Sequence, residues 1–190
     1  SNMLETLTEL DAVNRILSAI GSDPVTTLED DMDIDVINAR SILAAVSRDI
    51  QRKGWDFNRM TRTLTPTLGE KKIPWDTTTL TLKANDGNTY VKRGNWLYNM
   101  TQGTYEFSHP IDVEITCGVD FEDLPDPFKN YVIAKASIDF AMRYFGDANV
   151  AQDLQAALQM AHQDIVQYDM EMGSCNMLQI GETPSILERT

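Results

Sequence analysis

Three acidic residues lie close together just before a proline-rich segment. Asp120, Glu122 and Asp123 precede Leu124-Pro125-Asp126-Pro127. A glycosidase needs two carboxyl groups about 5–9.5 Å apart across a sugar ring. Adjacent acidic residues in a loop are more often simply solvated. The cluster therefore leaves a glycan hydrolase as an alternative function, although a solvated loop is the favoured interpretation.

Four aromatic residues between positions 90 and 105 could stack on such a glycan. They are Tyr90, Trp96, Tyr98 and Tyr105. Aromatic residues are also enriched in β-strands, where they fill the interior and the edges of a sheet. We favour this second interpretation for all four.

Alternating aspartates before a helical segment have the spacing of the first three calcium ligands of an EF-hand loop. These are Asp31, Asp33 and Asp35. Val36 stands where that loop requires glycine, and Ile42 where it requires a bidentate glutamate. A carboxylate at a helix N-terminus accepts backbone N–H bonds and interacts well with the helix dipole. We expect Asp33 or Asp35 to cap a helix.

The histidines and cysteines form no recognisable catalytic or metal-binding pattern. His109 and His162 have no cysteine at ligand spacing, and we interpret both as structural or surface residues. Cys117 and Cys175 are too few for a disulfide scaffold or a structural zinc site, which favours free thiols in a reducing compartment. There is no phosphate loop or dinucleotide fingerprint. The sequence thus predicts no enzyme, no cofactor and no metal.

Composition narrows the classes of function further. The chain has 190 residues, is 42% hydrophobic and carries a net charge of -13. This charge argues against a general nucleic-acid-binding surface and against docking on anionic lipid. No window reaches the roughly 18 apolar residues of a membrane span. Acidity keeps a protein soluble, and it also suits a conduit that DNA crosses without binding. A DNA mimic that binds a basic protein is a third, weaker hypothesis.

The stretch from Asp35 to Asn58 predicts the long amphipathic helix around which the chain is organised. Gly54 ends this helix, and Trp55 follows it. One apolar stripe runs along the helix at steps of three and four residues. Its members are Val36, Ala39, Ile42, Leu43, Val46 and Ile50.

Three more helices flank this one in the sequence. The first runs to Gly21 with Thr6 or Thr8 as its cap. The second follows Pro125, with Asp126 as candidate cap and Pro127 in its first turn, and ends at Gly146. The last begins near 147–149, and its stripe comprises Leu154, Leu158, Ala161, Ile165, Tyr168 and Met172. Gly173 is expected to stop it and to leave residues 174–190 as a tail.

Between the helical segments the residue composition changes, and threonines, aromatic residues and turn-forming residues become frequent. Short strands are expected at Thr61–Leu68, Leu80–Lys83, Thr89–Lys92, Asn95–Asn99 and Asp112–Cys117. Asn85-Asp86-Gly87-Asn88 predicts a tight hairpin turn. We expect one small antiparallel sheet with one solvated face.

The predicted fold class is therefore α+β. An antiparallel helical bundle is formed by helices from both ends of the chain, with a small antiparallel β unit inserted. The expected boundaries are 3–58 and 124–173 for the bundle, 59–123 for the insert and 174–190 for the tail.

Seven groups of residues, in order along the chain, form a recognisable pattern. They are Ala12-Val13-Asn14-x-Ile16-Leu17-x-x-Ile20-Gly21, Pro24-Val25-x-Thr27-Leu28-Glu29, Asp35-Val36-x-Asn38-Ala39-Arg40-x-Ile42-Leu43, Ile50-Gln51-x-x-Gly54-Trp55-x-Phe57-Asn58, Tyr90-Val91-x-Arg93-Gly94-x-x-Leu97-Tyr98, the group Pro125, Phe128, Tyr131, Lys135-Ala136, Phe140, Arg143 and Phe145-Gly146, and Tyr168-x-Met170-x-x-Gly173-x-x-Asn176-Met177-Leu178. This ordered set resembles the tail tubular protein A family, the head-to-tail adaptors or gatekeepers of short-tailed podoviruses. The resemblance covers nearly the whole chain and is weakest over 68–80 and after Gly181.

The resemblance implies a structural virion protein at the head–tail junction, assembled in the host bacterial cytoplasm. Members form a twelve-subunit ring between the portal protein and the tail nozzle, which resembles tail tubular protein B. DNA passes through the lumen without specific binding, and no membrane is involved. The isolated chain can be a monomer, because the portal can order such adaptors. No catalytic residue comes with this role. The alternative is a tail-associated hydrolase of capsule or peptidoglycan that uses the acidic cluster.

The resemblance also gives the central helix a role in the ring. Gly54, Trp55 and Phe57 become the joint where the chain leaves for the β unit, pinned through buried aromatic area. Four basic residues become candidates for subunit contacts, although exposed solvation explains each one equally well. They are Arg40, Arg48, Arg52 and Lys53.

Overall fold

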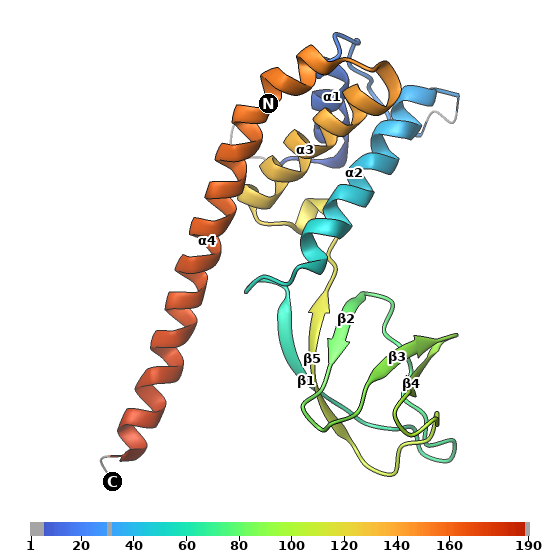
Figure 1. Ribbon diagram of the computed structural model, residues 1–190, viewed down its shortest axis with the longest axis vertical. Coiled ribbons are helices and arrows are strands. Elements are labelled where there is room, and N and C mark those ends of the chain that lie inside the picture. Colours follow the sequence, from blue (N-terminus) through green and yellow to red (C-terminus); the bar gives the residue numbers. More distant parts are fainter. Residues whose placement is uncertain (1–5, 30–31, 189–190) are drawn as a thin grey trace. The chain divides into compact units, whose positions relative to one another are not determined.

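The computed structural model describes the backbone of residues 6–29 and 32–188, and the side chains as far as Cys175. The chain divides into two compact units (Figure 1). Unit 1 comprises Ser1–Ile50 and Asp120–Thr190, and unit 2 comprises Gln51–Val119. Among the described residues, the four α-helices belong to unit 1, apart from the last two residues of the second helix, and the five strands belong to unit 2. The predicted α+β class, with helices from both ends and an inserted β unit, is confirmed.

The first helix, α1, spans Glu9–Ala19 and is capped by Thr8. The Thr8 hydroxyl oxygen accepts a bond from Asp11 N at 3.1 Å, and the Asp11 carboxylate accepts one from Thr8 N at 3.0 Å. This is a capping box, in which each side chain satisfies the other residue's N–H. The bonds from Thr8 lower the pKa of Asp11. Thr8 is therefore the cap, and not Thr6.

Helix α2 spans Ile34–Arg52 and begins at an aspartate. The Asp33 carboxylate accepts bonds from Asp35 N at 3.1 Å and Val36 N at 3.3 Å. Capping by Asp33, one of the two predicted residues, is thus confirmed, while Asp31 lies outside the described residues. All six residues of the predicted apolar stripe are buried.

Helix α3 spans Asp126–Phe145, and the sequence placed its start one residue late. Asp126 is the first helical residue and not the cap. Pro127 lies in the first turn, where no N–H donor is required. Gly146 ends the helix in the left-handed conformation, as predicted, with φ of 59°. The Asp147 carboxylate then accepts a bond from Val150 N at 3.1 Å and caps the next helix.

Helix α4 spans Ala148–Glu188, so the prediction that Gly173 ends it is wrong. Gly173 is not among the glycines with positive φ, and it therefore forms no left-handed cap. A glycine inside a helix costs only about 1 kcal/mol relative to alanine, which neighbouring helical residues can offset. The segment expected as an irregular tail is helical as far as Glu188.

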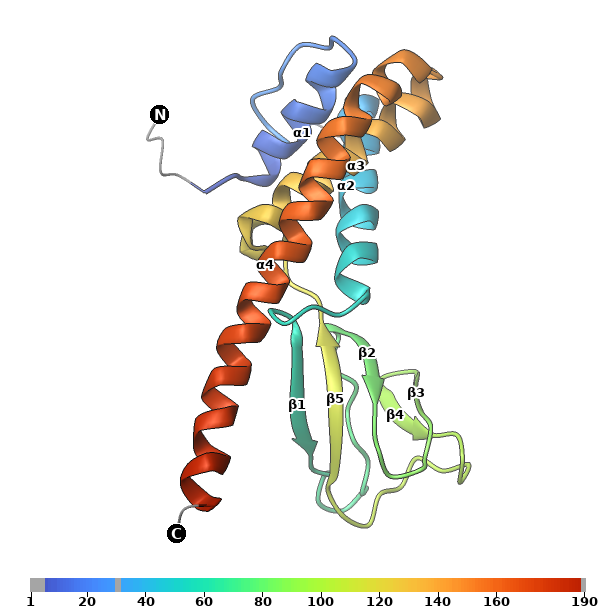
Figure 2. The same ribbon diagram turned by 60° about the vertical axis from the view of Figure 1, so that its left-hand side comes forward.

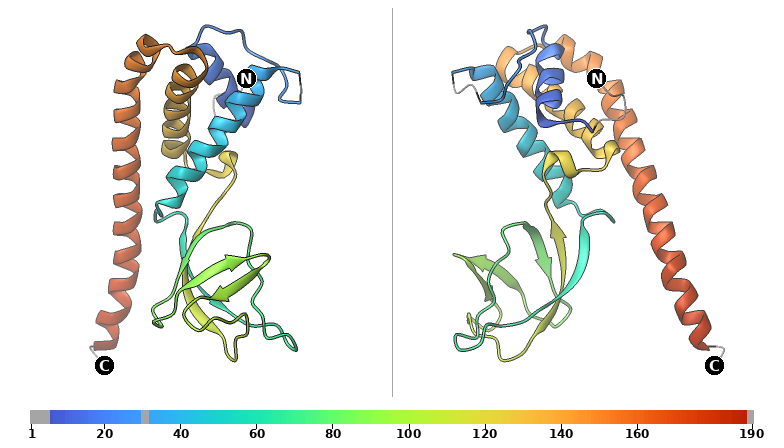
Figure 3. Two further views of the ribbon diagram at one scale, coloured as in Figure 1. Left: turned by 45° about the vertical axis from the view of Figure 1, so that its right-hand side comes forward. Right: turned by 180° about the vertical axis from the view of Figure 1, so that it is seen from behind.

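The core of unit 1 lies where α3 packs along α4 and contacts α1 (Figure 3). Phe128 and Phe140 of α3 are fully buried, as is Ile165 of α4. The ring of Phe128 meets the ring of Tyr168 edge-on, with centroids 6.2 Å apart. The inward face of α4 is therefore the one predicted from its apolar period.

Unit 2 contains two antiparallel sheets where one was expected (Figure 2). In the larger sheet, β5 (Ile111–Cys117) lies between β1 (Arg59–Leu64) and β2 (Thr79–Lys83). The smaller sheet pairs β3 (Tyr90–Arg93) with β4 (Trp96–Asn99). Four of the five predicted strands agree with the structure to within one residue at each end.

The predicted strand Thr61–Leu68 is too long, because β1 ends at Leu64. Pro66 lacks an N–H for a strand ladder. After Pro66 the chain reverses direction, and Thr67 N donates a hydrogen bond to Lys72 O at 2.8 Å. The chain therefore leaves the sheet four residues earlier than predicted.

The expected hairpin at Asn85–Asn88 is also wrong as a strand pairing. This turn connects β2 to β3, which belong to different sheets. The tight hairpin lies instead at Gly94-Asn95, because Arg93 pairs directly with Trp96. Gly94 has φ of 60°, which such a two-residue turn requires.

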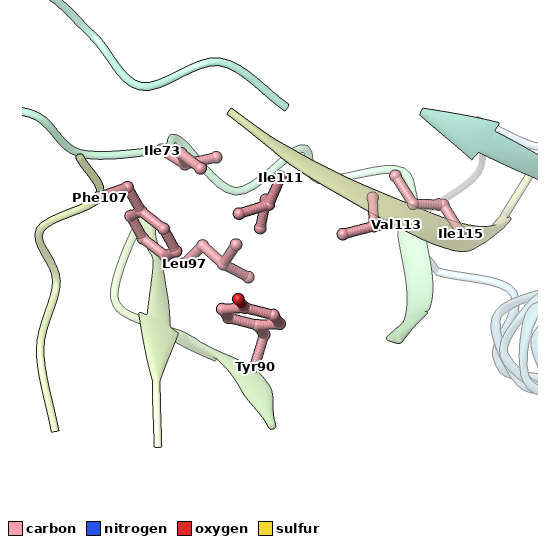
Figure 4. Packing of buried hydrophobic residues seen from close by; sticks show 7 residues of the cluster. All are labelled: Ile73, Tyr90, Leu97, Phe107, Ile111, Val113 and Ile115. Carbon is pink, nitrogen blue, oxygen red and sulfur yellow. The ribbon is translucent and has the colours of Figure 1, made fainter. Parts of the chain in front are cut away.

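One hydrophobic cluster joins the two sheets of unit 2 (Figure 4). Its buried members are Ile73, Tyr90, Leu97, Phe107, Ile111, Val113 and Ile115. The Tyr90 hydroxyl donates to the Asp86 carboxylate in the β2–β3 turn. Burial, and then this bond, raise the pKa of Tyr90 to about 12. The turn is thus fixed to the core by a polar contact.

Candidate assembly surfaces

The predicted joint begins with a glycine that cannot easily be replaced. Gly54 follows the end of α2, and its N–H donates to Gln51 O at 3.1 Å. Its φ of 79° lies in the left-handed region that favours glycine. A Cβ at this position would lie 3.1 Å from Arg59 Cδ and 3.2 Å from Thr116 Oγ1. Both the conformation and the close approach of neighbours therefore favour glycine.

A buried amide fixes the backbone after this glycine. Asn58 is only 1% exposed, and its side-chain oxygen accepts a bond from Trp55 N at 2.8 Å. Its side-chain nitrogen donates to Gln51 O at 2.9 Å and to Cys117 O at 3.0 Å. One side chain thus bonds the end of α2, the turn after it and the end of β5.

A second buried amide lies at the point where the chain enters unit 2. Gln51 is 2% exposed. Its Nε2 donates to Val119 O at 3.1 Å, and its Oε1 accepts from Val119 N at 2.8 Å. Gln51 is the first residue of unit 2 and Val119 the last. These two bonds therefore tie the entry and exit of the unit together.

The sequence did not reveal these roles of Gln51 and Asn58. Both residues stood in the quoted family motif, but an amide next to a helix end usually faces solvent. Only the pairing of β5 with β1 brings Val119 and Cys117 to them. The hydrogen-bonding roles of these two amides therefore depend on tertiary contacts, which the spacing of residues in the sequence does not indicate.

Trp55 and Phe57, the aromatic members of the predicted joint, are half-buried. The backbone of Trp55 is well fixed, since its carbonyl accepts bonds from Asn58 N and Arg59 N, both at 3.0 Å. The role of the two rings in pinning the joint stays a prediction.

The four basic candidates for subunit contacts are all exposed but differ in their bonding. Arg40 Nε lies 2.9 Å from Glu9 Oε1, and Arg40 NH1 donates to Leu28 O at 3.3 Å. Arg40 thus links α2 to the start of α1 and to the connector. Within the described part of the chain, Arg48 and Lys53 form no ion pair. Arg52 lies in the last turn of α2.

The acidic cluster lies on the surface of unit 1. Asp120, Glu122 and Asp123 are all exposed, and the last two lie in the short 3-10 helix Phe121–Asp123. Glu122 Oε1 accepts a bond from Glu9 N at 3.2 Å at the start of α1. Two cavities of unit 1 are lined by other residues. One lies along α4, and the other lies between α2 and α3 beside Asp49 and Asp139.

The four aromatic residues divide between core and surface. Tyr90 belongs to the core of unit 2, as favoured above. Trp96 and Tyr98 are half-buried, and Tyr105 is 37% exposed. These three lie with Lys72 and Arg93 beside the β3–β4 hairpin. We call the five residues the hairpin patch.

The histidines and cysteines occupy separate places. His109 and His162 are exposed, and the His162 ring lies 6.0 Å from that of Tyr131. Cys117 ends β5 with its sulfur 3.8 Å from the Met60 sulfur, and burial raises the pKa of its thiol. Cys175 is exposed on α4. No group of three potential ligands from His, Cys, Asp and Glu gathers among the described residues.

Unit 1 exposes large apolar side chains on several helices. On α4, Met160 is 66% and Met170 is 67% exposed, with Val166 between them. Val166 and Met170 line an open apolar groove along the helix with Cys175. Met142 and Phe145 are exposed near the end of α3. Grouped apolar side chains on a surface mark sites of contact with other proteins.

Charge is distributed very unequally between the two units. Unit 2 contains nine Lys and Arg residues against seven Asp and Glu residues. Unit 1 contains seven basic residues against 22 acidic ones. The acidity of the chain is therefore a property of unit 1 alone. Among the described residues, no helix combines the length and hydropathy needed to cross a membrane.

Comparison with known proteins identifies the family. A family model described as tail tubular protein matches residues 10–175. The chain belongs to the tail tubular protein family. The chain is also 35% identical over 159 residues to tail tubular protein A of Klebsiella phage KP34. The aligned region covers 78% of this chain and 80% of that protein.

The family match confirms the resemblance noted in the sequence. The matched residues include all but the first residue of α1, the whole of α2, the five strands and α3, and most of α4. Membership of the tail tubular protein family makes the chain a structural protein of the phage tail, and thus a component of the virion.

Proposed function

We propose that this tail tubular protein is a ring-forming head-to-tail adaptor, which joins the portal protein to the tail nozzle of a short-tailed phage. The observation that carries the proposal is the family match over residues 10–175, which includes both units and the joint. The ring is a dodecamer in the virion, and the isolated chain can be a monomer. DNA passes through its lumen.

The charge distribution supports a DNA channel that does not retain DNA. Unit 1 has 22 acidic residues against seven basic ones, so its surface repels the phosphate backbone. Proteins that bind DNA instead place basic side chains on the phosphates. An acidic unit around the lumen would let DNA move without sequence-specific or strong non-specific contacts.

The exposed apolar side chains of unit 1 support contacts with neighbouring proteins. Val166 and Met170 of α4 line one apolar groove, and Met142 and Phe145 of α3 are exposed near the end of that helix. In the proposed ring, the helical part forms contacts between copies and receives the portal. The β part contributes to the side that faces the nozzle.

Among the basic candidates, Arg48 and Lys53 fit subunit contacts best. Both are exposed and form no ion pair within the described residues. Arg40 instead bonds within unit 1, to Glu9 and Leu28. Gly54, Trp55 and Phe57 act as the joint at the end of α2, where Asn58 fixes the backbone.

We assign no catalytic residue, cofactor or membrane contact to the proposed adaptor. Its place is the head–tail junction of the virion, and its assembly takes place in the host bacterial cytoplasm. The function lies in contacts with the portal, the nozzle and other copies of the chain.

Reconstitution with the portal protein of the same phage tests the proposal. The purified chain is mixed with portal rings, and the complexes are imaged by negative-stain electron microscopy. We expect a second ring stacked on the portal with a continuous central channel. Portal rings that never acquire a second ring, over a range of salt and protein concentrations, would contradict the adaptor role.

A further inference from the structure

The hairpin patch combines aromatic rings and cations that contact one another. The Arg93 guanidinium lies 4.0 Å from the Tyr98 ring centroid, and the Tyr98 and Tyr105 rings are 4.7 Å apart. Lys72 Nζ lies 5.2 Å from the Trp96 ring and 5.8 Å from the Tyr105 ring. A cation over an aromatic face is attracted by the ring quadrupole. The five side chains therefore hold one another in place at the surface.

The backbone beneath the patch is also well fixed. Trp96 faces Arg93 directly in the β3–β4 ladder, and Trp75 N donates to Asn95 O at 2.9 Å. Asn99 N donates to Thr104 O at 2.9 Å and closes the turn that carries Tyr105. A surface fixed in this way loses little conformational entropy on binding.

The cations of the patch have no acidic partner in their own chain. Neither Arg93 nor Lys72 forms an ion pair with a carboxylate in the described residues. Tyrosine, tryptophan and arginine are the residues most enriched in the energetic centres of protein interfaces. The patch is thus chemically suited to an acidic protein segment. DNA fits less well, because 22 acidic residues of unit 1 belong to the same chain.

Unit 1 supplies an acidic segment of this kind. Segment 120–126 contains the exposed carboxylates of Asp120, Glu122, Asp123 and Asp126 and no basic residue. None of the four forms an ion pair within the described residues. A 3-10 turn and the start of α3 fix the backbone of the segment.

We propose that the hairpin patch of one copy binds segment 120–126 of a second copy. The inference rests on the proposed ring. A ring needs a heterologous interface, in which two different surfaces of the same chain complement each other. The segregation of charge between the two units provides such a pair of surfaces on every copy.

Charge reversal in the full-length chain tests the inference by the same assembly on portal rings. The patch variant carries Lys72→Glu and Arg93→Glu. A matched control carries Arg62→Glu and Lys83→Glu, which change the charge equally at exposed positions of unit 2 outside the patch. We expect the patch variant to form rings at least tenfold less often than wild type, and the control to form them normally. Circular dichroism and thermal unfolding verify that each variant is folded.

A second variant, in which the charges of both surfaces are reversed, tests whether segment 120–126 is the segment that binds the hairpin patch. Asp120→Lys and Asp123→Lys are added to the patch variant, so that every copy carries both surfaces with reversed charge. These two carboxylates are chosen because their side chains accept no hydrogen bond within the described residues, whereas Glu122 bonds Glu9. We expect the swap to restore most of the rings that the patch variant loses.

Three other outcomes would contradict the inference, and the last of them would also contradict the proposed function. If the patch variant assembles as well as wild type, the inference is wrong and the adaptor role stands. If rings are lost but the swap restores none, the patch binds another partner, such as the nozzle or portal, and the inference is again wrong. If the wild-type chain itself forms no ring, both this inference and the proposed function fail.

Discussion

Replacing Asn58 with alanine is expected to destabilise unit 2 strongly. The side chain forms three hydrogen bonds of 2.8 to 3.0 Å, to Trp55 N, Gln51 O and Cys117 O, and it is 1% exposed. Each such bond contributes about 0.5–1.5 kcal/mol net, and the buried partners left unpaired add a desolvation cost. We therefore expect a loss of about 3 kcal/mol in the free energy of unfolding.

Tryptophan fluorescence gives a readout specific to unit 2. All three tryptophans, at positions 55, 75 and 96, lie in this unit. With a urea m-value of about 1–1.5 kcal/mol per M, the expected loss lowers the midpoint of the fluorescence transition by about 2 M or more. Circular dichroism at 222 nm, which is dominated by the helices of unit 1, should change less.

A matched control separates the buried network from the loss of an amide in general. Asn85 is exposed in the turn between β2 and β3 of unit 2, and Asn85→Ala should change the free energy of unfolding by less than about 0.5 kcal/mol. If Asn58→Ala shifts the fluorescence transition no more than this control does, then the network does not hold the joint.

Three further predictions concern the joint and the core of unit 2. Gly54→Ala forces a side chain into φ of 79° beside Arg59, and urea unfolding should show a loss of about 1–3 kcal/mol; an unchanged midpoint would contradict the strain. Burial and the Asp86 bond raise the pKa of Tyr90 to about 12, so the stability that this group contributes is present below pH 10 and is lost as the pH rises from 10 to 12. Spectrophotometric titration should show one tyrosine ionising near 12 that is absent in Tyr90→Phe, and identical titration curves would refute the assignment. Trp55→Ala should lower both the thermal unfolding midpoint and the yield of rings on the portal, and the account of the joint fails if neither changes.

The helices could be predicted from the sequence because their signals are local. The apolar stripe of α2, the Asp33 cap and the stop at Gly146 depend on residues within one or two turns. The end of α4 could not be predicted in the same way. Gly173 is compatible with either a left-handed cap or a helix interior, and the sequence rule considers only the first.

The β unit was predicted less completely because strand partners are set by tertiary contacts. The strand positions followed from alternation and turn residues, but two sheets formed instead of one. The Asp86-Gly87 turn has good hairpin chemistry, yet Tyr90 bonds back to Asp86 and β3 pairs with β4. Local turn preference was thus outweighed by packing of the shared core.

The candidate site was predicted in part. Gly54 was found because a helix end with left-handed geometry has a recognisable residue. Gln51 and Asn58 were missed as bonding residues, since their partners are 68 and 59 residues away in the sequence. The hairpin patch was noticed only as aromatic residues, because its order depends on the fold around Lys72 and Arg93.

Cryo-electron microscopy of the head–tail junction in the intact virion of the same phage tests the central claim most directly. The account predicts a ring of copies of this chain between the portal and the nozzle, with unit 1 and unit 2 resolved in each copy and DNA in the lumen. A junction in which this chain lies elsewhere in the tail, or in which another protein joins portal to nozzle, would contradict it.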